Sequence, residues 1–228
     1  MVWLAAVLLF PGEEIAGRWK ALGMEQVKAG RLEAAAEAFR EACRLDEKEP
    51  DACYYLGRAL YVLGRYGEAK PPLRKALNAA PEEERWRVHR ALARNHEALA
   101  EYGEAEKRYR EAIRLAGGRA GPEEDPRIDY GSFLYRMGRL EEALKPLQEA
   151  VRAHPASARA RTELGRVHLQ ADRLAEAAQE LQKAVELDPR AWNARLLLGR
   201  AWVRMGRVAE GEKQLRLGQQ GQGSSTVR

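Results

Sequence analysis

The sequence predicts an all-α protein, a solenoid of short stacked helix–turn–helix units. Residues recur every 34 positions, so that Leu22-Gly23 returns as Leu56-Gly57. Apolar residues follow helical spacing, and no stretch shows the sustained period-two alternation that is typical of β-strands. Self-similarity at this period indicates an array of repeats rather than a globular enzyme domain.

Six units follow one another, and each has a large apolar residue followed by glycine or alanine. These pairs lie at positions 22–23, 56–57, 92–93, 130–131, 164–165 and 198–199. The steps between the small residues are 34, 36, 38, 34 and 34, so two units carry inserted residues, near Pro81–Arg85 and near Gly117–Pro126. We expect each small residue at a close helix crossing, because a larger side chain would wedge the two helices apart.

The turn within a unit is marked in four units by a glycine before an arginine. Such glycines are typical of helix ends before a tight turn; here they are Gly30, Gly64, Gly138 and Gly206. Prolines at 71, 72 and 146 fall inside the expected second helices, where proline normally causes a kink. Pro72 and Pro146 are equivalent in two units, so we expect the repeat to accommodate them.

The first unit resembles the tetratricopeptide repeat, a helix–turn–helix unit of 34 residues. Its signature spacing is matched by Trp19, Leu22, Gly23, Ala35 and Phe39, whereas Gln26 stands where the signature has tyrosine. The resemblance extends over roughly residues 14–217 and implies a right-handed superhelical solenoid of about six repeats. It also implies a protein that binds other proteins.

We expect one structural domain, the six-repeat solenoid of residues 14–217, with no internal linker. The best candidate for a joint is the stretch 117–126, rich in glycine and proline, which predicts a longer loop, with a hinge as the alternative. The last helix is polar and is expected to act as the solvating cap of the array. Residues 218–228 contain three glycines and no core residues, and we expect them to be a disordered tail.

The apolar segment of residues 1–13 has two interpretations. Val2–Phe10 is wholly apolar but too short to span a bilayer, which takes about 20 residues. It is similar to the apolar region of a secretory signal, although no lysine or arginine precedes it and no A-x-A cleavage site follows. The alternative is a segment that covers the open face of the first repeat. The balance slightly favours an exported or periplasmic protein over a cytoplasmic one.

The two cysteines, Cys43 and Cys53, fall on helices that are expected to pack as neighbours. A disulfide is therefore one interpretation. Two small buried thiols are the favoured interpretation, because free cysteine is among the most buried residue types. Their spacing matches no zinc motif.

No motif in the sequence indicates catalysis, a cofactor or a metal site. His96 and His168 occupy the core tyrosine slot of their repeats, and His89 lies about 10 Å along the helix from His96, too far to share one metal ion. There is no phosphate-binding glycine loop and no nucleophile elbow. We therefore expect a non-enzymatic protein with no catalytic residues, no metal and no cofactor.

One set of residues indicates a binding surface. The resemblance implies that the first helix of each repeat lines a concave groove, and that the residue after the small slot points into it. Four of these six residues are arginine, and further basic residues and tyrosines lie nearby. Arginine contacts carboxylates in bidentate fashion, and tyrosine supplies rigid contact area. The candidate binding residues are Lys20, Tyr54, Arg58, Tyr61, Arg87, Arg90, Arg94, Tyr135, Arg159, Arg166 and Arg200.

A general preference for arginine is the competing explanation, since the chain has 30 arginines and 9 lysines. With the groove interpretation, the function is a protein-binding scaffold whose partner presents an extended acidic segment. The alternatives are a regulatory or targeting subunit of an enzyme complex and, least favoured, an RNA-binding repeat protein. Acidic residues interrupt the basic face and regular stacking platforms are absent, which disfavours nucleic acid.

Overall fold

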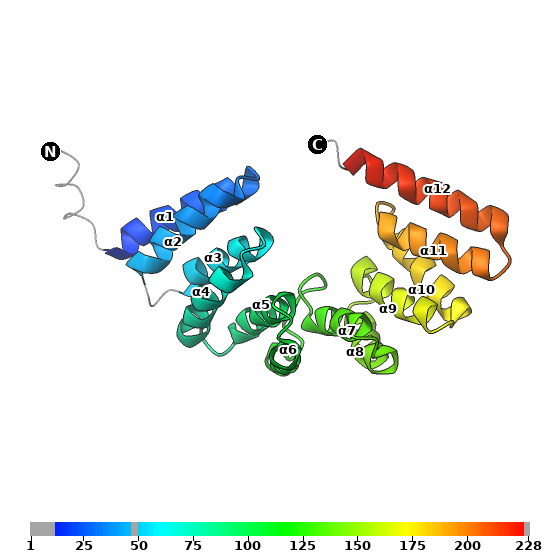
Figure 1. Cartoon of the computed structure of the whole chain (residues 1–228), viewed down its shortest axis with the longest axis horizontal. Coiled ribbons are helices and arrows are strands. Elements are labelled where there is room, and N and C mark those ends of the chain that lie inside the picture. Colours follow the sequence, from blue (N-terminus) through cyan, green and yellow to red (C-terminus); the bar gives the residue numbers. More distant parts are fainter. Residues whose placement is uncertain (1–11, 47–49, 226–228) are drawn as a thin grey trace. The chain divides into compact units, whose positions relative to one another are not determined.

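The computed structural model describes residues 12–46 and 50–225, and within them the chain forms twelve α-helices and no strand (Figure 1). The helices divide into two compact units, Met1–Ala116 and Gly117–Arg228. Unit 1 contains α1 (Gly12–Lys28), α2 (Leu32–Leu45), α3 (Pro50–Val62), α4 (Tyr66–Ala79), α5 (Arg85–Ala98) and α6 (Tyr102–Ala116). Unit 2 contains α7 (Pro126–Arg136), α8 (Leu140–Ala153), α9 (Ala158–Gln170), α10 (Leu174–Leu187), α11 (Trp192–Arg204) and α12 (Val208–Ser225).

The division into two units differs from the single domain that the sequence predicted. The boundary falls at Gly117, where the stretch rich in glycine and proline begins. Both Gly117 and Gly118 have positive φ angles, of 51° and 91°. The left-handed backbone at these two glycines ends helix α6, and the longer loop that follows leads to α7.

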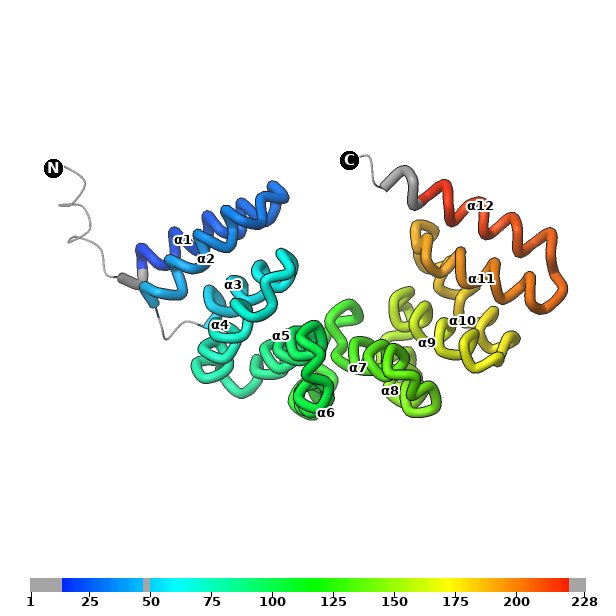
Figure 2. The backbone as a smooth tube through the Cα atoms, viewed as in Figure 1, coloured from blue at the N-terminus to red at the C-terminus, as the bar shows by residue number. Residues whose placement is uncertain are grey.

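The six helices of each unit pair into three hairpins. The hairpins of a unit stack on one another, as the smoothed backbone shows (Figure 2). The first helix of a repeat packs on the second helix of the same repeat, and that second helix packs on the first helix of the next repeat in the unit. First helices also contact each other directly, α3 with α5, α7 with α9 and α9 with α11. The all-α repeat fold predicted from the 34-residue period is confirmed.

The small slot of each repeat lies at a close helix crossing, as predicted. A Cβ atom added to Gly57 would come within 2.4 Å of the Leu73 side chain, and one added to Gly165 within 2.6 Å of Leu181. The same relation holds between Gly131 and Leu147. Glycine is needed at these positions because the second helix inserts a large apolar side chain directly against the backbone of the first.

The turn glycines also behave as predicted. Gly30, Gly64, Gly138 and Gly206 have φ angles between 73° and 82°. The other two repeats place Ala100 and Asp172 in the same turn, with φ angles of 58° and 60°. These two residues adopt a left-handed conformation that costs free energy for any residue with a Cβ atom.

Helices α4 and α8 continue through their internal prolines, Pro71, Pro72 and Pro146. Each proline leaves the carbonyl group four residues earlier without its helical hydrogen bond. For the two prolines of α4 these carbonyls belong to Gly67 and Glu68, which are exposed. Water can satisfy both groups, so the repeat accommodates proline there, as the sequence indicated.

The C-terminal segment differs from the prediction. Residues 218–228 were expected to be disordered, yet α12 extends to Ser225. Gly218 and Gly221 are buried, and Cβ atoms on them would meet Leu196 and the ring of Trp192 within 2.7 and 2.2 Å. Glycine lets the last helix lie close to α11, so residues that were counted as a tail because they lack apolar side chains are part of the packing.

The cysteines also differ from the favoured interpretation. Cys43 of α2 and Cys53 of α3 form a disulfide, with 4.8 Å between their Cα atoms. Helices of successive repeats approach closely enough for the two small side chains to meet. The predicted roles of the apolar segment fall on residues 1–11, which lie outside the described residues. No helix in the described parts of the chain is long and apolar enough to cross a membrane.

Candidate functional site

In unit 1, arginine side chains lie over the tyrosine rings of the first helices. Tyr54 of α3 is buried, and the guanidinium carbons of Arg58 and Arg87 lie 5.5 and 5.4 Å from its ring centre. Arg58 is four residues away on the same helix, whereas Arg87 comes from α5. Guanidinium groups at this distance from an aromatic ring are attracted by its electron-rich face.

A second arginine–tyrosine pair repeats this arrangement further along the same helices. The guanidinium carbon of Arg94 on α5 lies 5.1 Å from the ring centre of Tyr61 on α3. The separation in sequence is 33 residues, the same as between Tyr54 and Arg87. Two neighbouring first helices are therefore joined twice by an arginine that lies over a tyrosine.

The remaining predicted residues of unit 1 are on the same helices or next to them. The Nζ atom of Lys20 on α1 lies 3.8 Å from the Asp51 carboxylate, so its charge is partly balanced. Arg90 is half-buried on α5 between Arg87 and Arg94. We call this set the unit 1 row: Lys20, Tyr54, Arg58, Tyr61, Arg87, Arg90 and Arg94.

Within the unit 1 row, Arg58 is more available to a ligand than Lys20, whose charge is partly balanced by Asp51. Its side chain is exposed, and it forms no ion pair with any of the described residues; its contact is with the ring of Tyr54. The ring orients the guanidinium group while leaving its N–H donors for a ligand.

The predicted residues of unit 2 are Tyr135, Arg159, Arg166 and Arg200, which we call the unit 2 row. Arg166 lies 6.0 Å from the ring centre of Tyr135, and its Nε atom is 3.3 Å from the Glu163 carboxylate. Arg200 is exposed and forms no ion pair within residues 12–46 and 50–225. In the unit 2 row, a carboxylate of the chain itself therefore pairs with one of the arginines.

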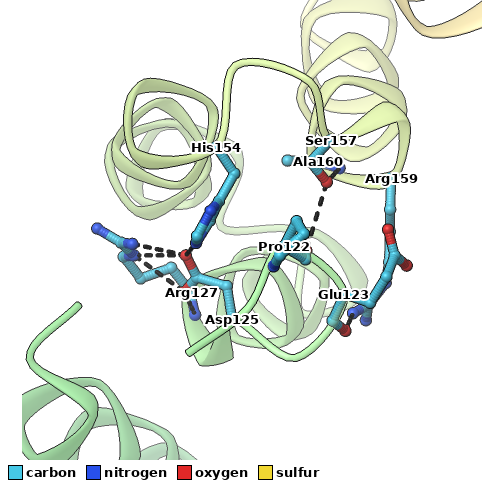
Figure 3. A network of polar contacts seen from close by, with 8 residues as sticks. All are labelled: Pro122, Glu123, Asp125, Arg127, His154, Ser157, Arg159 and Ala160. Carbon is cyan, nitrogen blue, oxygen red and sulfur yellow. Dashed lines mark hydrogen bonds and ion pairs between the residues drawn. The ribbon is translucent and has the colours of Figure 1, made fainter. Parts of the chain in front are cut away.

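Arg159 has a structural role that the sequence did not reveal. Its guanidinium group forms an ion pair with Asp129. It also donates a hydrogen bond of 2.6 Å to the carbonyl oxygen of Glu123 (Figure 3). The hydroxyl of Ser157 donates to the carbonyl oxygen of Pro122 at 3.4 Å. The loop that leads to α7 is therefore fastened to α9 by bonds to its backbone.

A second set of polar contacts surrounds Asp125 at the start of α7. Its carboxylate, almost fully buried, accepts hydrogen bonds from the backbone N–H and the guanidinium group of Arg127. The Nε2 atom of His154 lies 3.3 Å away (Figure 3). Hydrogen bonds between charged groups are stronger than those between neutral groups. The hydrogen bond to Asp125 raises the pKa of Arg127.

The buried histidines are in three different environments. Burial and the nearby Arg108 lower the pKa of His89 to about 4. The Nδ1 atom of His96 pairs with the Glu101 carboxylate, whose own pKa is lowered by Lys70 and by His96. Burial lowers the pKa of His168.

Among the described residues, no group of three histidine, cysteine, aspartate or glutamate side chains is placed to hold a metal ion. The chemistry that the two rows offer is recognition by guanidinium donors and aromatic surface.

Comparisons with known proteins agree with the repeat architecture. A model of the tetratricopeptide repeat matches residues 20–84 and 131–191, and a second model with the same description matches residues 168–227. The chain is 36% identical over 124 residues to the type IV pilus assembly protein PilF of Pseudomonas aeruginosa. That alignment covers 53% of this chain and 46% of PilF, so it spans about half the length of this relative.

Two solved structures from pilus biology are similar in fold. The structure of Pseudomonas aeruginosa PilF has a TM-score of 0.67 and 28% identity, and the match covers 76% of each chain. The structure of PilW, described as a widely conserved type IV pilus biogenesis factor, has a TM-score of 0.75, with 88% of this chain and 90% of PilW covered. At 17% identity, the likeness to PilW concerns the fold alone.

Proposed function

Because this chain belongs to the tetratricopeptide repeat family, we propose that it is a non-enzymatic scaffold whose unit 1 row binds an extended acidic segment of a partner protein. The observation that carries the proposal is that two arginines lie over the ring of Tyr54, Arg58 from its own helix and Arg87 from α5. A flat ring that holds guanidinium donors in place lowers the entropy cost of binding a carboxylate.

The chemistry of the unit 1 row favours carboxylates over other ligands. An exposed ion pair contributes on the order of 0.2–1 kcal/mol, so one arginine would select a partner only weakly. Several cations along neighbouring helices act together on an extended acidic chain, and they raise both its association rate and its selectivity.

The similarity to PilF supports a partner within the machinery of type IV pilus assembly. The disulfide between Cys43 and Cys53 supports a working place in an oxidising compartment, since disulfides persist in secreted and periplasmic proteins and are rare in the cytosol. It favours the exported alternative over the cytoplasmic one.

The test compares Arg58→Glu with Arg74→Glu. Both arginines are exposed in unit 1, and Arg74 lies on the second helix α4, outside the unit 1 row. Proteins that co-purify with each variant from the native host are identified and quantified, and the binding of the main partner is then measured with purified components. We expect Arg58→Glu to weaken binding at least tenfold and Arg74→Glu to change it less than twofold, with unchanged circular dichroism.

Equal losses from the two variants would show that overall charge, and not the row, recognises the partner. A complementary measurement counts surface pili in cells that carry each variant as the only copy. Normal pili with Arg58→Glu, despite lost partner binding, would separate the scaffold proposal from the pilus proposal.

A further inference from the structure

Two histidines occupy the same place in units 1 and 2. His96 lies in the last turn of α5 and His168 in the last turn of α9, and both are buried, at 3% and 7% exposure. The backbone that follows has the same path: the N–H of Glu101 donates to the carbonyl of His96 at 2.8 Å, and the N–H of Arg173 donates to the carbonyl of His168 at 2.9 Å. Glu101 and Arg173 are therefore structurally equivalent residues.

The side chains at these equivalent positions differ in charge. In unit 1 the Glu101 carboxylate binds the Nδ1 atom of His96 and accepts a hydrogen bond of 2.7 Å from Lys70. In unit 2 the guanidinium group of Arg173 turns to Glu141 at 2.7 Å. The Nδ1 atom of His168 is buried and has no hydrogen-bond partner among the described residues. Buried polar atoms are nearly always paired, so this atom lacks a partner that its counterpart has.

His168 lines a pocket of about 570 Å³ within unit 2. The pocket lies among α8, α9 and α10, and no residue of the unit 2 row lines it, so it is separate from the surface of the proposed function. Beside His168, its polar lining residues are Gln148, Arg152, Arg173, Glu176, Gln179 and Glu180.

Two arginines and two glutamates line the pocket around His168. Glu180 is engaged with Arg161 at 2.6 Å, and Arg173 shares its charge with the exposed Glu141. Arg152 is exposed and has no ion pair within the described parts of the chain. Glu176 opposes an incoming negative charge, and Arg152, which is not engaged in an ion pair, is the cation left to attract a carboxylate.

We propose that this pocket binds a carboxylate group of a partner protein, which takes beside His168 the place that Glu101 holds beside His96 in unit 1. Arg173 and Arg152 balance its charge, and the glutamine amides of Gln148 and Gln179 supply further donors. The neutral imidazole donates its Nδ1–H, in the tautomer that a carboxylate selects.

The bound carboxylate makes the binding depend on pH. In the free protein, burial and Arg173 lower the pKa of His168, and the carboxylates of Glu176, Glu180 and Glu141 offset this in part. A carboxylate ligand raises that pKa again, so binding takes up a proton. We expect affinity to rise as the pH falls from 8 towards 6.

The test titrates three alanine-rich peptides into the full chain, and the first two are blocked at both ends. The first carries one internal glutamate, the second carries glutamine in its place, and the third has neither but ends in a free C-terminal carboxylate. The ring resonances of His168 report binding by NMR. We expect the glutamate or the C-terminal peptide to shift them saturably, which identifies the source of the carboxylate, and the glutamine peptide to bind at least tenfold more weakly.

Arg173→Glu supplies the missing carboxylate from within the chain. In this variant the pKa of His168 should rise and peptide binding should be lost. The matched control is Arg190→Glu, an exposed arginine of unit 2 outside the pocket, which should bind like the native chain. Equal loss in both variants, a glutamine peptide that binds as tightly as the better of the two carboxylate peptides, or no movement of His168 with any peptide at millimolar concentration would overturn the proposal.

Discussion

Units 1 and 2 have the same helical framework but differ in the groups that contact the basic side chains of their first helices. In unit 1, arginines of α3 and α5 lie over tyrosine rings. In unit 2, Arg166 also lies over a tyrosine ring, but carboxylates of the chain itself pair with Arg166 and with Arg159. A ring orients an arginine without cancelling its charge, whereas a carboxylate does both. A repeat protein can thus change what its surface recognises while every helix crossing stays the same.

The buried histidines show the reverse difference. His96 in unit 1 has its carboxylate partner within the chain, and His168 in unit 2 does not. The interactions that the chain completes by itself therefore differ between equivalent positions of the two units. Recognition in such arrays depends on which interactions the chain completes by itself.

The largest expected effect tests what the two units share. Leu73→Ala and Leu181→Ala each remove a fully buried side chain that packs on the glycine of a first helix. Each should lower the free energy of unfolding by about 2–5 kcal/mol, through lost apolar contacts and the cavity left behind. Denaturant melts measure both values. If only one of the two variants lost less than about 0.5 kcal/mol of unfolding free energy, the shared helix crossing would not stabilise the two units equally.

Acid should destabilise the protein through His89 of unit 1. The folded pKa of about 4 lies below the ordinary value of 6.5, so between these values the unfolded state binds the proton and the folded state does not. Stability should therefore fall as the pH drops from 6.5 to 4, by up to about 3 kcal/mol. Urea melts across this range should show a clearly smaller loss for His89→Phe. If that variant loses as much stability in acid as the native chain, another group is responsible.

The disulfide is a property of unit 1 alone, because all the cysteines of the chain are in it. Replacing Cys43 and Cys53 with serine should lower the stability by about 2–3 kcal/mol, the amount expected for releasing a loop of this length in the unfolded chain. Melts with and without a reducing agent measure the effect. In the double variant, the reducing agent should make no difference.

The smallest expected effect concerns the turns. Ala100→Gly in unit 1 relieves a left-handed backbone, and Gly138→Ala in unit 2 imposes the same strain on a turn that lacks it. We expect changes of about 1 kcal/mol, stabilising for the first and destabilising for the second. Thermal melts of the two variants should shift in opposite directions, and shifts of the same sign would contradict this account of the turns.

The sequence predicted the helices because the repeat shows the same signal several times. The slots of Gly57, Gly131 and Gly165, and the turn glycines, all lie where the period placed them. The C-terminal helix was missed for a physical reason: Gly218 and Gly221 contribute to packing by the absence of a side chain, and composition alone treats such residues as tail-forming.

The site was predicted in part. Side chains such as Arg58 and Arg87 meet at Tyr54 because a period of 34 brings neighbouring first helices together. The contact of Arg159 with a loop carbonyl depends on the longer of the two insertions, and the repeat period does not predict the path of that loop. The difference between His96 and His168 had a signal in the sequence, since glutamate follows one histidine by five residues and arginine the other.

The bond between Cys43 and Cys53 also determines what happens if the chain is cut. A protease that hydrolyses any peptide bond between the two cysteines leaves two fragments that remain covalently attached. Such a nicked molecule keeps its mass apart from one added water, and it separates into fragments only after reduction. The first repeat would thus stay attached to the rest of the protein after a cleavage that would release it from an uncrosslinked chain.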